Sequence, residues 1–108
     1  PILQSYTGPM KAETESANLD SELHSLLHQD VVVDVTGPFL YIGNLQKIDP
    51  VSVTLVDADA HNLRETNTGT ERYLIEAKKH GVRINRHRVL VMKRVIMSIS
   101  PLDAVVSY

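Results

Sequence analysis

The side chains best able to do chemistry are basic and lie together late in the chain. Between positions 83 and 94 stand Arg83, Arg86, His87, Arg88, Lys93 and Arg94. Lys and Arg neutralise phosphates, which gives the salt-dependent and sequence-independent part of nucleic-acid binding. On a strand, Arg86 and Arg88 would share one face and His87 the other. Phosphate contact is one interpretation of this run. The alternative is a solvated strand edge, or ion pairs with the acidic half of a neighbouring subunit.

Two spacings could bind a metal ion. Asp57, Asp59 and His61 fall on alternate positions and could chelate a divalent cation, although such alternation is also typical of a solvated strand end. His24 and His28 have the i, i+4 spacing of zinc ligands, but Ser25 follows His24 where the zinc-protease motif has Glu, and no third ligand is evident. We therefore expect no metal and no cofactor.

The composition argues against an enzyme. There is no Cys, which excludes disulfides, thiolate metal sites and cysteine nucleophiles. The sequence contains no glycine-rich phosphate loop and no nucleophile elbow. It also lacks a signal-peptide h-region and any apolar run near the ~20 residues that span a bilayer. We expect a cytoplasmic protein that has no membrane partner and no catalytic activity.

The charges divide along the chain. Residues 1–63 hold nine acidic and two basic side chains, a net −7, whereas residues 64–108 hold nine basic and four acidic ones, a net +5. Such a split could steer a polyanion to one face or bring neighbouring subunits together. The alternative is that one barrel interleaves both halves and mixes the charges.

The elements that must position these residues begin with a short helix. Residues 1–17 show no apolar period and are expected to form a flexible tail. A helical stripe follows, with Asn18 or Asp20 as its cap; its members are Leu19, Leu23, Leu26 and Leu27. We expect one domain over residues 18–108.

From Val31 the apolar period becomes two. Strands are predicted over residues 31–36, 39–48, 51–58, 88–92 and 95–99. A turn is predicted at Thr36-Gly37-Pro38, where Gly can take a positive φ. Gly43 stands in the middle of the longest strand, and a glycine there is typical of a sharp bend or bulge that curls a small sheet.

An insertion at about 63–88 separates the third strand from the fourth. Thr68-x-x-Glu71 has the pattern of a capping box, Lys78, Lys79 and His80 suit a last helical turn, and Gly81 suits the C-terminus. The sequence therefore predicts a helix here. Its Tyr73, Leu74 and Ala77 could bind a partner or pack the helix on the barrel.

This order of elements, and the residues at its turns, resemble the Sm/LSm family. The first motif of that family is similar to four segments here: Val31–Gly37, Tyr41–Leu45, Ile48-Asp49 and Val53–Ala58. The second motif is similar in spacing to Val89–Val91 and Val95–Pro101. The resemblance implies an all-β fold with short helices, in which an N-terminal helix precedes a strongly bent, five-stranded antiparallel SH3-like barrel. It also implies a homo-oligomeric ring in which the fourth strand of one subunit pairs with the fifth of the next.

The departures from the family concern its RNA site. RNA-binding members carry a ring or His and then Asn after the Asp, where this chain has Pro50-Val51-Ser52. Met92 and Lys93 stand at the Arg and Gly positions of the second motif, and Val95 replaces its Asn. Only Asp49 matches the base pocket. The candidate RNA-contacting residues are Asp49, Ser52, Arg86, Arg88, Lys93 and Arg94.

Two functions follow as hypotheses. One is an oligomeric Sm-like module that binds single-stranded RNA through its backbone at a basic patch. The other is an Sm-fold ring or scaffold for protein–protein assembly that has lost RNA binding.

Overall fold

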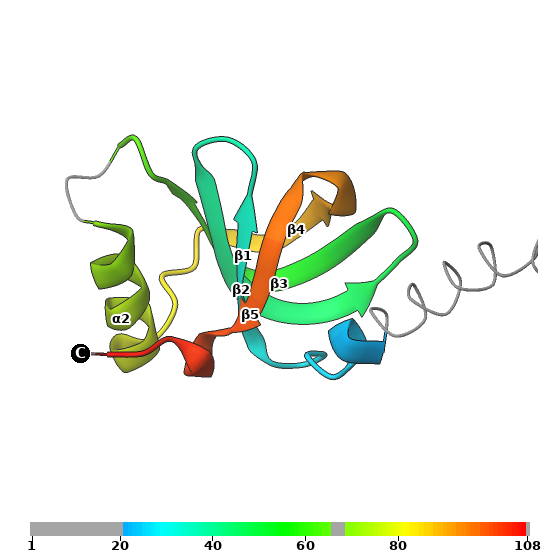
Figure 1. Ribbon diagram of the computed structural model, residues 1–108, viewed down its shortest axis with the longest axis horizontal. Helices are drawn as coiled ribbons and strands as arrows, with labels where there is room; N and C mark the ends of the chain where they lie inside the picture. Colours follow the sequence, from blue (N-terminus) through cyan, green and yellow to red (C-terminus); the bar gives the residue numbers. More distant parts are fainter. Residues whose placement is uncertain (1–20, 66–68, 108) are drawn as a thin grey trace, which may run out of the picture.

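The computed structural model describes residues 21–65 and 69–107. Five strands form one antiparallel sheet in the order β4-β3-β2-β1-β5 (Figure 1). The elements in chain order are β1 (Asp30–Val35), β2 (Phe39–Ile48), β3 (Ser52–Asn62), α2 (Thr70–His80), β4 (Arg86–Met92), the 3₁₀ turn η1 (Lys93–Val95), β5 (Ile96–Pro101) and the 3₁₀ turn η2 (Leu102–Ala104). The predicted all-β fold with short helices is confirmed. The strand from 39 to 48 is as predicted, whereas β3 runs four residues further and β4 starts two residues earlier.

The bend predicted at Gly43 is present and has a steric cause. Between the pairs Ile42–Asp59 and Asn44–Val56, β2 contributes only Gly43, while β3 contributes two residues. One of these, Asp57, has a φ of 48°, as expected for the extra residue of a bulge. A Cβ at position 43 would lie 2.8 Å from the Cβ of Ala58, so only glycine lets the two strands approach so closely.

The curved sheet does not close into a complete barrel. No ladder joins β4 to β5 within the described residues, and these two strands are the edges of the sheet. The turn η1 links β4 to β5, and two backbone hydrogen bonds attach it to other parts of the sheet. The Lys93 amide donates to the Val51 carbonyl (2.9 Å), and the Thr36 amide donates to the Val95 carbonyl (2.8 Å). The fold therefore keeps its two edge strands available for other chains.

The sheet is covered on both faces. One core cluster contains Val31, Val33, Leu45 and Leu55. The second contains Val32 with side chains from β2, α2 and η2 (Leu40, Ile42, Ala77 and Leu102). The apolar triplet 31–33 is explained by this arrangement, because alternate β1 side chains enter different clusters and all are buried.

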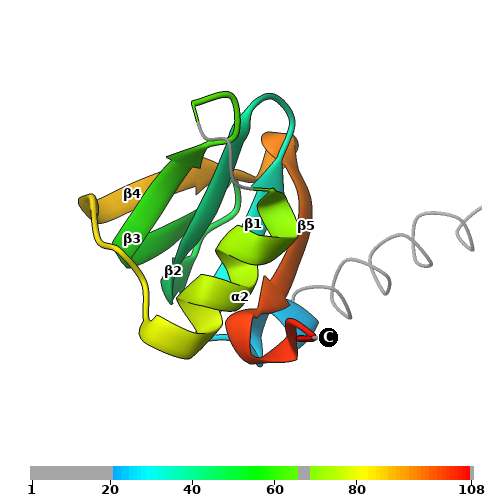
Figure 2. The same cartoon turned by 90° about the vertical axis from the view of Figure 1, so that its left-hand side faces the viewer.

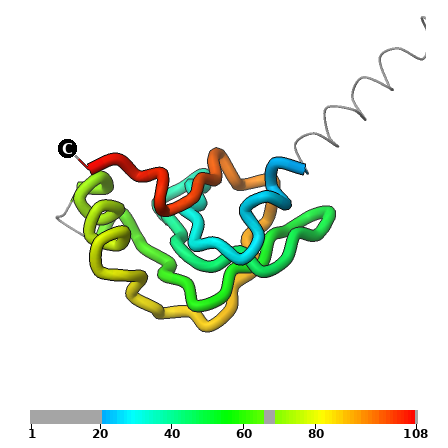
Figure 3. The backbone as a smooth tube through the Cα atoms, turned by 90° about the horizontal axis from the view of Figure 1, so that it is seen from below, coloured from blue at the N-terminus to red at the C-terminus, as the bar shows by residue number. Residues whose placement is uncertain are grey.

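The helices lie at opposite ends of the strands (Figures 1 and 3). Residues 21–24 are helical and are followed by turns, and Leu26 and Leu27 pack against the first cluster. The predicted tail 1–17 and the helix start at Asn18–Asp20 lie outside the described residues. The whole of α2 is at the other end, in front of the sheet in Figure 2. None of the described helices has the length and apolar character that a membrane span requires.

The start of α2 differs from the prediction, while its end agrees. Its N-cap is Gly69, in an extended conformation and without a side-chain cap, so the capping box predicted from Thr68 is wrong. With Gly69 at the N-cap, Glu71 lies one position too early to complete such a box. The helix ends as predicted at Gly81, whose φ is 94° and whose amide donates to the Ala77 carbonyl (2.9 Å).

Candidate nucleic-acid interface

Two of the predicted RNA-contacting residues belong to the turn between β2 and β3. The Asp49 amide donates to the Ser52 carbonyl (2.8 Å), which closes the turn. The Asp49 carboxylate is partly exposed and lies 3.7 Å from the ammonium group of Lys47. Ser52 is only 4 % exposed and pairs with Met92 across the ladder. The turn therefore presents Asp49 to solvent and keeps Ser52 inside.

Lys93 and Arg94 are brought to the same turn by η1. The Lys93 amide donates to the carbonyl of Val51, a residue of the β2–β3 turn. Arg94 follows it in the 3₁₀ turn and is exposed, while Lys93 is half-buried. Four of the six candidate residues, separated by up to 45 positions in the chain, thus gather around the β2–β3 turn.

Arg86 and Arg88 lie elsewhere. They stand near the start of β4, opposite Ala58 and Val56, and both are exposed. The seven residues of β4 extend about 20 Å at the usual rise per residue. The predicted basic cluster is therefore divided into two groups, and only the group on η1 adjoins the β2–β3 turn.

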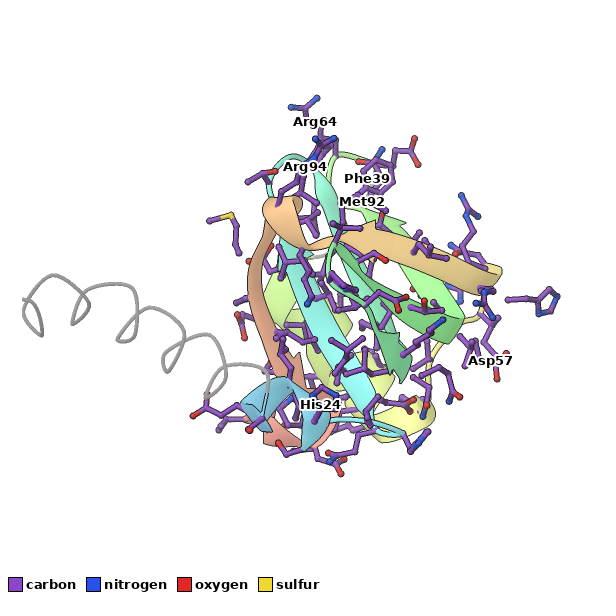
Figure 4. The ribbon with its side chains drawn as sticks, turned by 90° about the vertical axis from the view of Figure 1, so that its right-hand side faces the viewer. His24, Phe39, Asp57, Arg64, Met92 and Arg94 are labelled. Carbon is purple, nitrogen blue, oxygen red and sulfur yellow. The ribbon has the colours of Figure 1, made fainter. Side chains whose placement is uncertain are left out.

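Two further exposed residues lie close to the β1–β2 turn and were not predicted from the sequence. Phe39 is 37 % exposed at the start of β2, and Arg64 is exposed just after β3. Their neighbours are joined by a hydrogen bond from the Leu63 amide to the Pro38 carbonyl (2.8 Å). Figure 4 shows Phe39 and Arg64 at the same end of the molecule as Arg94, opposite His24. They are distant from residue 94 in sequence, so no local pattern could identify them.

The predicted metal-binding alternatives are not supported. The bulge interrupts the strand alternation, so Asp57 is exposed and projects outward (Figure 4), whereas Asp59 is 6 % exposed. The helix containing His24 ends there, and His28 lies in a turn with a φ of 68°. Asp57 and Asp59 therefore do not share one face as the spacing suggested. Over residues 21–65 and 69–107 no group of three or more possible ligands comes together.

A second polar cluster ties α2 to β3. The carboxylate of buried Asp59 accepts hydrogen bonds from the Tyr73 hydroxyl (2.5 Å) and from the Asn85 side-chain amide (2.9 Å). The His61 and Tyr73 rings stack, with centroids 3.8 Å apart and planes at 9°. Burial raises the pKa of Tyr73 far above its ordinary value; Asp59 raises it further through its hydrogen bond and charge, and the charge of Arg83 opposes these effects. The Tyr73 hydroxyl therefore stays protonated near neutral pH and keeps donating its hydrogen bond to Asp59.

The structure was compared with known proteins. No family model and no curated protein matches the sequence. An Sm protein of Pyrococcus abyssii, solved in complex with a uridine heptamer, is similar at a TM-score of 0.51 and 20 % identity, over 75 % of this chain and 93 % of that one. A heptameric archaeal Sm protein gives 0.52 and 20 %, over 75 % and 96 % of the two chains. The P. aerophilum SmAP1 heptamer gives 0.54 and 20 %, over 77 % and 90 %. These likenesses confirm the expected Sm-like fold.

Proposed function

We propose that this chain is an Sm-like module that self-associates through its edge strands and binds single-stranded RNA mainly by its backbone. One observation carries the RNA part of the proposal: η1 places Lys93 and Arg94 beside the Asp49 turn. The resemblance described above implies an RNA site at this turn. Support also comes from the archaeal Sm protein that was solved with a uridine heptamer.

The mode of binding follows from the side chains available. No ring or Asn follows Asp49, and Ser52 is buried, so this turn offers little to stack on a base or to read its edge. Lys93 and Arg94 offer positive charge there, whereas exposed Phe39 lies at the other end of β2 from this turn. We therefore expect affinity that depends strongly on salt and little on base identity.

Self-association is supported by the two sheet edges. On β4, Leu90 is 50 % and Met92 37 % exposed; on β5, Met97 is 69 % exposed. Unpaired backbone groups beside exposed apolar side chains favour pairing with another strand. The proposed ring joins β4 of one subunit to β5 of the next, and two of the similar structures are heptamers.

The alternative function is a ring or scaffold without RNA binding. The absent ring and Asn, and the burial of Ser52, favour it. In both versions the activity is binding rather than catalysis, and the cytoplasmic location expected from the cysteine-free composition belongs to the same proposal.

Fluorescence anisotropy distinguishes the two functions. Labelled uridine-rich and adenine-rich oligomers would be titrated with the full chain at low and at physiological salt. Similar affinities that fall steeply with salt are expected for backbone contact. Tight binding that favours uridine would contradict the mode proposed here. No binding at low salt would leave only the scaffold.

A further inference from the structure

The inserted segment builds a cavity that the proposed RNA site does not use. Its volume is about 630 Å³, within the range of small-molecule sites. One wall is the face of α2 formed by Tyr73, Glu76, Ala77 and His80, which have helical spacing. The rest comes from the end of β3 and the segment between α2 and β4. In Figure 1, α2 lies at the left of the sheet and the β2–β3 turn at the right, and no residue of that turn or of η1 lines the cavity.

The floor of the cavity is polar and rigidly held. Asp59 is fixed there by Tyr73 and Asn85, and Asn85 is fixed in turn, because its side-chain oxygen accepts from the Ala60 amide (2.8 Å). These are the features of a preorganised site, in which polar side chains do not rearrange when a ligand arrives.

One side of the cavity is aromatic and contains an unsatisfied polar atom. His61 and Tyr73 both line it, and their parallel rings form a flat stack. The Nε2 atom of His61 is buried and has no hydrogen-bond partner among the described residues. A buried polar atom without a partner is costly, so the wall of the cavity carries an unmet hydrogen-bond requirement beside the stack. A planar ring with a polar edge fits these requirements.

The rim carries a cation that no side chain neutralises. Arg83 lines the cavity, is exposed, and makes no ion pair within residues 21–65 and 69–107. The two carboxylates that also line the cavity have other partners: Glu76 lies 3.4 Å from His80, and Asp59 accepts hydrogen bonds from Tyr73 and Asn85. A guanidinium presents a planar fork of donors that suits a phosphate group. The rim therefore favours an anionic group attached to the planar ring.

We propose that this cavity binds a nucleoside monophosphate, with the base beside His61 and Tyr73 and the phosphate at Arg83. The nucleotide could be free in solution or could be the terminal nucleotide of an RNA chain. The proposal does not rest on RNA binding at η1, because the two sites share no residue.

Calorimetric titration of the full chain tests the proposal. AMP and UMP are expected to bind at one site per chain, adenosine and uridine to bind more weakly, and inorganic phosphate to bind weakest. Arg83→Gln should weaken nucleotide binding at least fivefold. Arg72→Gln is the matched control, because Arg72 is an exposed arginine on α2 that does not line the cavity; it should change nothing.

Two further experiments distinguish a free nucleotide from an RNA end as the ligand, and this cavity from η1 as the binding site. A linear oligomer with a terminal phosphate that competes with UMP, while a circular one of the same sequence does not, would identify an RNA end as a ligand. A free nucleotide alone would be the ligand if neither oligomer competes. Replacing Lys93 and Arg94 with Gln should leave UMP binding unchanged. The proposal is overturned if no nucleotide binds at millimolar concentration, if phosphate binds as well as UMP, or if Arg83→Gln has no effect.

Discussion

Gly43 on β2 lies directly against Ala58 on β3, close enough that a methyl group at position 43 would approach the Ala58 Cβ to 2.8 Å. This contact sits at the bulge where the two longest strands bend together. The curvature of the sheet, and with it the meeting of η1 and the β2–β3 turn, depends on it.

Gly43→Ala should therefore destabilise the fold by about 1–3 kcal/mol, the usual cost of overpacking. Chemical denaturation measures this loss. Ala58→Gly in the same chain should recover a large part of it, because the second change removes the atom that clashes. The contact explanation is wrong if the two changes simply add. Gly69→Ala controls for the added methyl group, since nothing lies within 4 Å of a Cβ there, and it should cost only the replacement of a favoured N-cap residue.

Tyr73→Phe should lower the free energy of unfolding by about 1–3 kcal/mol at pH 7, because buried Asp59 loses a hydrogen-bond donor. Tyr41→Phe is the matched control: its hydroxyl makes no hydrogen bond within the described residues. An equal loss in both variants would show that the Tyr73 hydroxyl has no special role.

The contribution of Tyr73 should also depend on alkaline pH. Its pKa is raised in the folded chain, so above the ordinary tyrosine value of about 10 the unfolded chain releases a proton that the folded chain retains. The contribution of Tyr73 to the free energy of unfolding is therefore complete below pH 10 and is lost as the pH rises further. In urea titrations from pH 8 to 11, the difference between wild type and Tyr73→Phe should shrink above pH 10. A constant difference would contradict this.

Changing Lys93 and Arg94 together to Gln should weaken RNA binding and reduce its salt dependence. Two lost phosphate contacts correspond to a decrease of about 1.4 in the slope of log K against log salt for a single strand. Anisotropy at four salt concentrations measures this slope. Lys79→Gln, an exposed change on α2, should leave it unchanged. If the slope is the same in all three proteins, RNA does not bind at η1.

Leu90→Lys should shift the chain toward the monomer, because it places a charge on an exposed apolar position of an edge strand. Size-exclusion chromatography with light scattering gives the mass. Val106→Lys changes an equally exposed apolar residue outside the sheet and should have no effect. Wild-type protein that is a monomer at high micromolar concentration would contradict self-association itself.

Local signals predicted much of the fold. Alternation located β1 and β2, and three glycines lie where the backbone favours glycine: Gly43 at a close approach of two strands, and Gly37 and Gly81 with φ of 96° and 94°. The capping box failed because two adjacent residues, Thr68 and Gly69, can both precede a helix, and the pattern does not choose between them.

The candidate sites were less predictable, because they are made by distant residues. Asp59 meets Tyr73 and Asn85 from 14 and 26 positions away, and the bulge at Asp57 changes which side chains share a face. Uninterrupted alternation of side chains along the strand therefore predicted, incorrectly, that Asp57 and Asp59 lie on the same face. The basic run is continuous in the sequence, but the length of β4 separates Arg86 and Arg88 from η1.

The position of β1 in the sheet has a consequence for how the protein is made. Val31 pairs with Pro101, 70 positions later in the chain, so the first strand to leave the ribosome receives one of its two partners last. At translation rates of about 5–20 residues per second, the apolar β1 waits about 4–14 s for β5. During this interval β1 has an open edge that can pair with another nascent chain, so we expect folding during synthesis to depend on chaperones that cover it.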